Sequence, residues 1–142
     1  MWDIYPGLLS GKSGPMRNIS RLLVFKLGAK GKLPPAPPMN KMVLDPPPFT
    51  GTQKQVDQGK ALFARYCSGC HGDAAISGAL NPDLRHSGAI ASADTIKAVV
   101  LDGALKHNGM VSFKSAVKAA DAEAIRQYLI KRANEDKALE GT

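Results

Sequence analysis

The sequence predicts an all-α domain that follows an extended, proline-rich segment. After residue 50, apolar residues recur at spacings of three and four in three places, as in helices with one buried face. Nine of the ten prolines lie at or before Pro48, which marks a boundary between an extended and a packed part. The loops over 72–91 and 104–118 are long for a compact domain, which predicts that they wrap around a bound group.

The three predicted helices cover about residues 54–66, 92–103 and 121–136. Ser92 is a good N-cap for the second helix and Gly103 a good stop. In each helix the apolar or small residues share one face. They are Val56, Gly59, Phe63 and Tyr66 in the first helix, Ile96, Val99 and Val100 in the second, and Ala122, Ile125, Leu129 and Ala133 in the third.

The N-terminal third contains one strand-like run and one spacer. Residues 21–27, Arg-Leu-Leu-Val-Phe-Lys-Leu, are typical of a buried strand, but no second strand is predicted to pair with it. We therefore expect this orphan strand to belong to the sheet of another polypeptide or of a missing domain. Seven of the fifteen residues in 34–48 are proline, which favours a polyproline II spacer with a reach of about 45 Å.

The charge pattern argues against a nucleic-acid partner. The chain has 19 Lys and Arg against 12 Asp and Glu, a formal charge of +7, which alone would suggest an anionic partner. However, residues 1–50 hold seven cations and two anions, so most of the excess lies before the packed domain. No apolar run approaches the roughly 18–20 residues that a membrane span needs. We expect neither nucleic-acid binding nor a membrane span.

The chain's two cysteines lie in Cys67-Ser68-Gly69-Cys70-His71, at the end of the first predicted helix. C-x-x-C-H is the attachment motif of c-type haem, in which both thiols form thioethers and the histidine binds iron. A thioredoxin-like redox pair would need a strand before the motif and a helix after it. A zinc site would need two more ligands, and the only other histidines are His86 and His107. The motif therefore predicts haem c.

Met110 is the predicted sixth iron ligand. It lies 39 residues after His71 in the second long loop, and Gly109 before it allows close backbone approach. His86 and His107 are the alternatives for a bis-histidine site, although exposed loop positions are expected for both.

Two residues of the first loop are predicted to support the haem. A ligating histidine needs its other ring nitrogen held, and the carbonyl of Pro82 is the candidate for His71. Arg85 is a candidate partner for a haem propionate. A simple loop turn at Pro82 and an ordinary exposed arginine are the alternatives.

Residues 56–135 resemble a class I cytochrome c. The residues that carry the resemblance are Gly59 and Phe63, Cys67, Cys70 and His71, the Pro82 turn, Gly109 and Met110, and Tyr128. The resemblance implies three main helices around one covalently bound haem, with the first helix crossing the last closely at Gly59. Val111 departs from the family, in which proline often follows the ligand methionine.

A longer resemblance takes in the first third. The run at 21–28, the proline-rich spacer and Pro82-Asp83-Leu84-Arg85 resemble the C-terminal end of PQQ-dependent quinohaemoprotein alcohol dehydrogenases. The resemblance implies that 1–33 is the remnant of a β-propeller end, 34–50 a linker and 51–142 the cytochrome c domain. PQQ and the catalytic residues would lie in the propeller, so this chain would have no substrate chemistry and no catalytic residue of its own.

The expected function is one-electron transfer. With His71 and Met110 as iron ligands, electrons would come from the PQQ dehydrogenase and pass to a cytochrome, a cupredoxin or an oxidase. Lys106, Lys114 and Lys118 flank the methionine loop and are candidates for a docking rim. The alternatives are a free-standing periplasmic shuttle and a haem sensor or peroxidase-like enzyme with a labile sixth ligand. Haem c maturation implies a periplasmic location.

Overall fold

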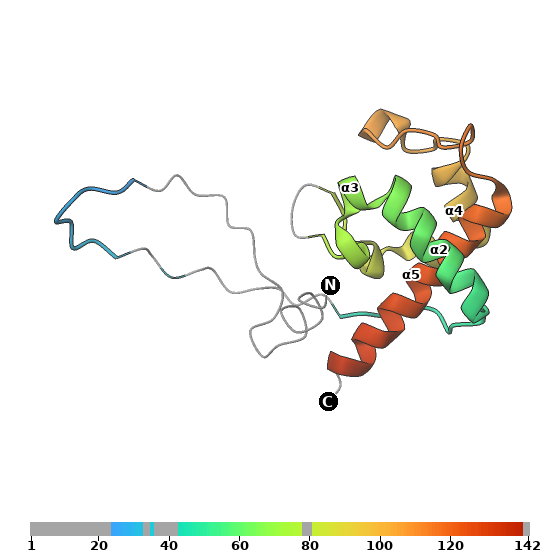
Figure 1. Ribbon diagram of the computed structural model, residues 1–142, viewed down its shortest axis with the longest axis horizontal. Coiled ribbons are helices and arrows are strands. Elements are labelled where there is room, and N and C mark those ends of the chain that lie inside the picture. The colour runs from blue at the N-terminus through green and yellow to red at the C-terminus, as the bar shows by residue number, and fades with distance from the viewer. Residues whose placement is uncertain (1–23, 33–34, 36–42, 78–80, 141–142) are drawn as a thin grey trace. The chain divides into compact units, whose positions relative to one another are not determined.

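The computed structural model describes residues 24–32, 35, 43–77 and 81–140. The chain divides into two compact units, Met1–Met42 and Val43–Thr142. In the described part, every helix lies in the second unit (Figure 1).

The second unit is helical and contains no strand among its described residues. Its α-helices are α2 (Gln53–Tyr66), α3 (Ser68–His71), α4 (Ala93–Val100) and α5 (Ala119–Glu140). Its short 3-10 turns are η1 (Asp73–Ala75), η2 (Leu84–His86), η3 (Gly88–Ala91) and η4 (Lys106–Asn108). The three predicted helices are therefore confirmed as α2, α4 and α5. The turns η1 to η3 lie in the first predicted loop and η4 in the second.

The helix ends follow local hydrogen bonding. Helix α2 begins after Thr52, whose hydroxyl accepts a hydrogen bond from the backbone N–H of Gln55 while the Gln55 side chain accepts from that of Thr52. Helix α4 begins after Ser92 as expected, but it ends at Val100, three residues before the predicted stop. After the helix the chain changes direction at Gly103, whose φ of +70° is in the left-handed region that favours glycine.

Helix α5 extends beyond the predicted range at both ends. The Asp121 carboxylate accepts a hydrogen bond from the backbone N–H of Lys118, 3.0 Å away, which satisfies a donor before the first turn. In the last third, Lys131 pairs with Glu135 at 3.0 Å, an (i, i+4) ion pair of the kind that stabilises a helix surface.

The core forms where α2 crosses α5 (Figure 1). A Cβ atom on Gly59 would lie 2.0 Å from the carbonyl oxygen of Ala124, so only glycine fits at this crossing. One turn later, the rings of Phe63 and Tyr128 pack with their centroids 5.5 Å apart, and both side chains are buried. The close crossing that the class I resemblance implies is therefore present.

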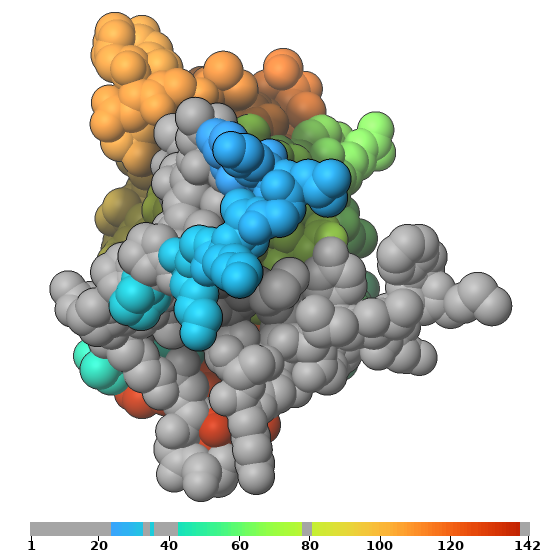
Figure 2. All heavy atoms as spheres, turned by 90° about the vertical axis from the view of Figure 1, so that its left-hand side faces the viewer, coloured from blue at the N-terminus to red at the C-terminus, as the bar shows by residue number. Residues whose placement is uncertain are grey.

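The strand predicted over 21–27 is not seen in the described part of the first unit. Residues 24–27 form no strand, and 21–23 lie outside the described residues. Val24, Phe25 and Leu27 are at least 84% exposed, and Gly28 turns the chain with a φ of +78°. Figure 2 shows the segment that contains them in blue. The physical reason is that an isolated strand leaves its backbone N–H and C=O groups unpaired. Of the spacer predicted over 34–48, only 35 and 43–48 are described.

The segment 43–50 packs along α5 instead of standing clear of the helical unit. Leu44 is buried, with 1% of its surface exposed. The contacts to α5 are Asp45 with Lys137 at 3.0 Å, the carbonyl of Pro47 with the Asn134 amide at 2.9 Å, and Phe49 with the Lys131 ammonium at 5.7 Å from the ring centroid. The three α5 residues are spaced by three, so they share one face of the helix.

Candidate haem site

Helix α3 brings the two thiols and His71 together. Cys67 closes α2 by donating its backbone N–H to the carbonyl of Phe63, and its own carbonyl accepts from the N–H of His71, each at 2.9 Å. Both thiols are free; Cys67 is half-buried and Cys70 exposed. Burial, and secondarily the neighbouring Cys70, raise the pKa of the Cys67 thiol to about 11. Two thiols and an imidazole thus lie within one helical turn, as the motif requires.

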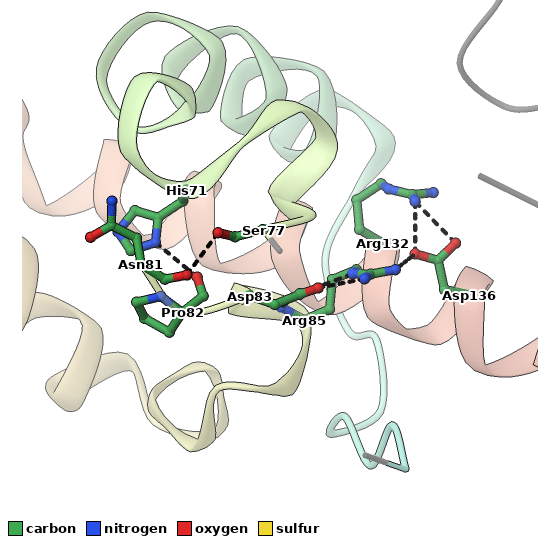
Figure 3. Close-up of polar contacts among 8 residues, drawn as sticks. All are labelled: His71, Ser77, Asn81, Pro82, Asp83, Arg85, Arg132 and Asp136. Carbon is green, nitrogen blue, oxygen red and sulfur yellow. Dashed lines mark hydrogen bonds and ion pairs between the residues drawn. The ribbon is translucent and has the colours of Figure 1, made fainter. Parts of the chain in front are cut away.

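His71 is buried and oriented by the first loop. Its Nδ1 atom lies 3.0 Å from the carbonyl oxygen of Pro82 (Figure 3). A carbonyl can only accept, so Nδ1 carries the proton and the lone pair of Nε2 is free to bind a metal. The predicted contact between Pro82 and His71 is therefore present.

Gly72, directly after His71, was not singled out from the sequence. Its φ is +74°, and a Cβ atom there would lie 2.1 Å from the carbonyl oxygen of Ile76. The chain must turn back sharply here to bring the first loop over His71. The only sequence signal was a glycine adjacent to the motif.

Arg85 lies in an ion-pair cluster instead of at an exposed loop position. Its guanidinium pairs with Asp83 at 2.5 Å and with Asp136 of α5 at 2.8 Å (Figure 3). Burial opposes the charge, but the hydrogen bonds to Asp83 and Asp136 outweigh it and raise the pKa of Arg85. These contacts use three of its five N–H groups, which leaves two for a further anion such as a propionate.

The loop that carries Met110 is held by α4. The N–H of Phe113 donates to the carbonyl of Val100 at 2.8 Å, and the hydroxyl of Ser112 donates to that of Leu101. Gly109 has a φ of +92°, so the turn before the methionine requires the left-handed region. Met110 is half-buried and packs against the same apolar cluster as Cys67, Leu84 and Phe113.

The two remaining histidines differ in exposure. His107 is exposed, as expected. His86 is half-buried, and its Nδ1 atom is buried with no hydrogen-bond partner in the described part, so the expectation of an exposed loop residue is wrong for it. Its position in the short turn η2, which packs against α5, accounts for the burial.

The surroundings of the motif can be compared with the two alternatives to haem. Within the described ranges, no three His, Cys, Asp or Glu residues gather closely enough to hold a metal ion. A thioredoxin-like pair would follow a strand, whereas Cys67 follows α2. Cys67 and Met110 pack against one apolar cluster. Together with the free thiol of Cys70 and an imidazole whose Nε2 is available, they fit a covalently attached haem.

Known proteins similar to this chain point the same way. The family model described as cytochrome c oxidase, cbb3-type, subunit III matches residues 54–129. Quinohemoprotein alcohol dehydrogenase ADH IIB of Pseudomonas putida is 46% identical over 85% of this chain, and the dehydrogenase subunit of alcohol dehydrogenase (quinone) of Komagataeibacter europaeus is 42% identical over 93%. The solved structure of ADHIIG from Pseudomonas putida HK5 matches with a TM-score of 0.58 and 35% identity over 78% of this chain.

These relatives are much longer proteins. The chain spans 18% of the length of both curated relatives and 16% of the solved structure. Within the described part of the chain, none of the helices has the length and apolar character that crossing a bilayer demands. The match over residues 54–129 takes in α2, the thiol and imidazole motif, α4 and half of α5. The chain belongs to the cytochrome c family of this cbb3-type subunit III model, and its cytochrome c domain is homologous to the cytochrome c region of quinohemoprotein alcohol dehydrogenases.

Proposed function

We propose that the chain carries one haem c, attached through Cys67 and Cys70, with His71 and Met110 as iron ligands, and that it transfers single electrons. The observation that supports this most is the contact between His71 Nδ1 and the Pro82 carbonyl, because it leaves Nε2 available for iron. Bound haem would supply a one-electron iron couple.

The chain's own residues would limit the iron redox couple to electron transfer. With His71 and Met110 both holding the iron, no coordination site would be left for a substrate. The thioether of Met110, a soft ligand, would favour ferrous iron and so raise the midpoint potential. The apolar cluster under Cys67 and Met110 would exclude water from the porphyrin.

We further propose that the electron donor is a PQQ-dependent dehydrogenase. The alignment with 42% identity covers 93% of the chain, so it must include most of the first fifty residues. The similarity therefore extends beyond the cytochrome domain. On this proposal 1–33 is the end of a β-propeller, 34–50 the linker and 51–142 the cytochrome c domain. PQQ would stay in the propeller, and the chain alone would not oxidise an alcohol.

The surface beside Met110 suits a docking partner. The loop over 104–110 projects from its unit (orange in Figures 1 and 2), and Leu105 and Val111 are 41% and 60% exposed. Three lysines between residues 106 and 118 are also exposed: Lys106, Lys114 and Lys118. We propose this surface as the docking rim for a periplasmic acceptor, which would be a cytochrome, a cupredoxin or an oxidase.

The ligand assignment is tested with Met110→Ala in the haem-loaded protein, with Val111→Ala as the matched control from the same loop. We expect Met110→Ala to bind carbon monoxide when reduced and to have a lower midpoint potential, while Val111→Ala behaves as the wild type. Unchanged carbon monoxide reactivity and potential in Met110→Ala would contradict the assignment. Carbon monoxide binding by the wild type would favour the sensor or peroxidase-like alternative.

The donor assignment is tested by mixing the haem-loaded chain with a PQQ-dependent alcohol dehydrogenase and a primary alcohol. We expect haem reduction that requires both the dehydrogenase and the alcohol. If the haem stays oxidised during turnover, the donor assignment fails while the cytochrome remains, and the free-standing shuttle becomes the better account.

A further inference from the structure

Four charged side chains join the end of α5 to the turn that follows Pro82. Asp136 of α5 accepts hydrogen bonds from Arg85 at 2.8 Å and from Arg132 at 2.8 and 3.0 Å (Figure 3). Arg85 also holds Asp83, through Nε at 3.0 Å. The side chains of Arg85, Asp83 and Asp136 are only 13–16% exposed, so solvent screens these pairs weakly. The cluster fixes the turn to α5.

The turn presents the carbonyl that faces His71. The carbonyl carbon of Pro82 is bonded to the backbone nitrogen of Asp83, and the peptide group is planar. The Asp83 carboxylate accepts from both the backbone N–H and Nε of Arg85, at 3.1 and 3.0 Å, so Asp83 cannot rotate freely. On the N-terminal side of Pro82, the hydroxyl of Ser77 donates a hydrogen bond to the carbonyl of Asn81 at 2.7 Å. The Pro82 carbonyl is thus held from both sides.

We propose that Asp136 is a positioning residue that acts through Arg85 to hold the Pro82 carbonyl against His71 Nδ1 and so tunes the iron ligand. The inference rests on the proposed ligation of iron by His71. A firmly held acceptor polarises the Nδ1–H bond and makes the other ring nitrogen more basic, which favours oxidised iron. Loosening the cluster weakens this hydrogen bond and raises the midpoint potential.

Glu135 provides a matched control beside Asp136. It pairs with Lys131 and with Arg132, each at 3.0 Å, but it makes no contact with Arg85 among those described. Its side chain is 44% exposed. Glu135→Gln therefore removes the same charge from the same part of α5 without touching the cluster's link to the turn.

The experiment compares Asp136→Asn, Arg85→Lys and Glu135→Gln in the haem-loaded chain. The first readout is the exchange rate of the His71 Nδ1 proton, followed by NMR in the reduced protein, and the second is the midpoint potential. We expect exchange about tenfold faster in Asp136→Asn, equivalent to about 1.4 kcal/mol, and within about twofold of wild type in Glu135→Gln. The potential rises in Asp136→Asn by more than in Glu135→Gln.

Arg85→Lys separates positioning from charge. It keeps the positive charge but loses the forked pairing, so we expect faster exchange and a raised potential here too. It also keeps the inference testable if Asp136→Asn fails to fold. Equal exchange rates and potentials in Asp136→Asn and Glu135→Gln, or an unchanged Arg85→Lys, would overturn the inference. Absence of covalent haem, or of iron ligation by His71, in the wild type would instead overturn the proposed function.

Discussion

The crossing of α2 and α5 makes Gly59→Ala the most informative stability test. The added Cβ would lie 2.0 Å from the carbonyl oxygen of Ala124 and 2.9 Å from the Cβ of Tyr128. Close carbon–oxygen contacts in proteins are about 3.3 Å, so the helix backbones must separate by roughly 1 Å. Neither neighbour is the flexible end of a side chain, so rotation about a side-chain bond cannot relieve the clash.

The expected cost can be estimated from two opposing effects. Overpacking a well-packed core costs about 1–3 kcal/mol, and the rigid backbone here places Gly59→Ala at the upper end. Alanine gains about 1 kcal/mol over glycine in a helix interior. The net loss is therefore about 2 kcal/mol, which corresponds to a fall in Tm of roughly 10 °C for a domain of this size.

Urea unfolding followed by helical circular dichroism measures this loss in the haem-loaded chain. Gly88→Ala is the matched control, because a Cβ at Gly88 meets nothing within 4 Å and its φ is not positive. We expect Gly88→Ala to stay within about 0.5 kcal/mol of wild type. A Gly59→Ala variant as stable as Gly88→Ala would show that the helices do not cross this closely and would refute the reasoning.

Two further predictions concern a helix cap and an ion pair. Ser92→Ala removes the hydroxyl that accepts from the Thr95 N–H at 3.3 Å, so we expect a loss of about 1 kcal/mol in urea unfolding, and no loss would mean that α4 is not capped there. Hydrogen bonding to Arg126 holds the pKa of Glu123 below its usual value, so the ionised form stabilises the fold. The stability that the ionised Glu123 adds is complete above the pKa of a glutamate in the unfolded chain, about 4.3. It is lost as the pH falls through the lower pKa that Glu123 has in the folded chain. Glu123→Gln should therefore destabilise at pH 7 and progressively less below about pH 4, and a pH-independent difference would contradict this.

The parts of the site that the sequence predicted depend on short-range chemistry. Cys67, Cys70 and His71 lie within one turn because four residues of helix place them there, whatever the rest of the chain does. The Pro82 contact was predictable because a ligating histidine needs a second hydrogen-bond partner and a proline in the first loop can present its carbonyl. The helices followed from apolar spacing and caps such as Ser92.

The parts that it missed depend on residues far apart in the chain. Asp136 lies 51 residues from Arg85, and no local pattern indicates that α5 brings them together. The same holds for Asp45 and Lys137, which are 92 residues apart and join the predicted linker to α5. The strand expected over 21–27 needs a partner sheet outside this chain, and no strand of the described residues pairs with it.

The central claim is that Cys67, Cys70 and His71 hold one covalent haem. The direct measurement is to produce the chain in a bacterial host that attaches haem c, denature it in acidic organic solvent, and record its mass and haem absorption. We predict one haem per chain that survives denaturation, and its loss from the polypeptide when Cys67 and Cys70 are both changed to serine. Haem that extracts from the wild-type chain, or a polypeptide with no haem, would contradict the claim.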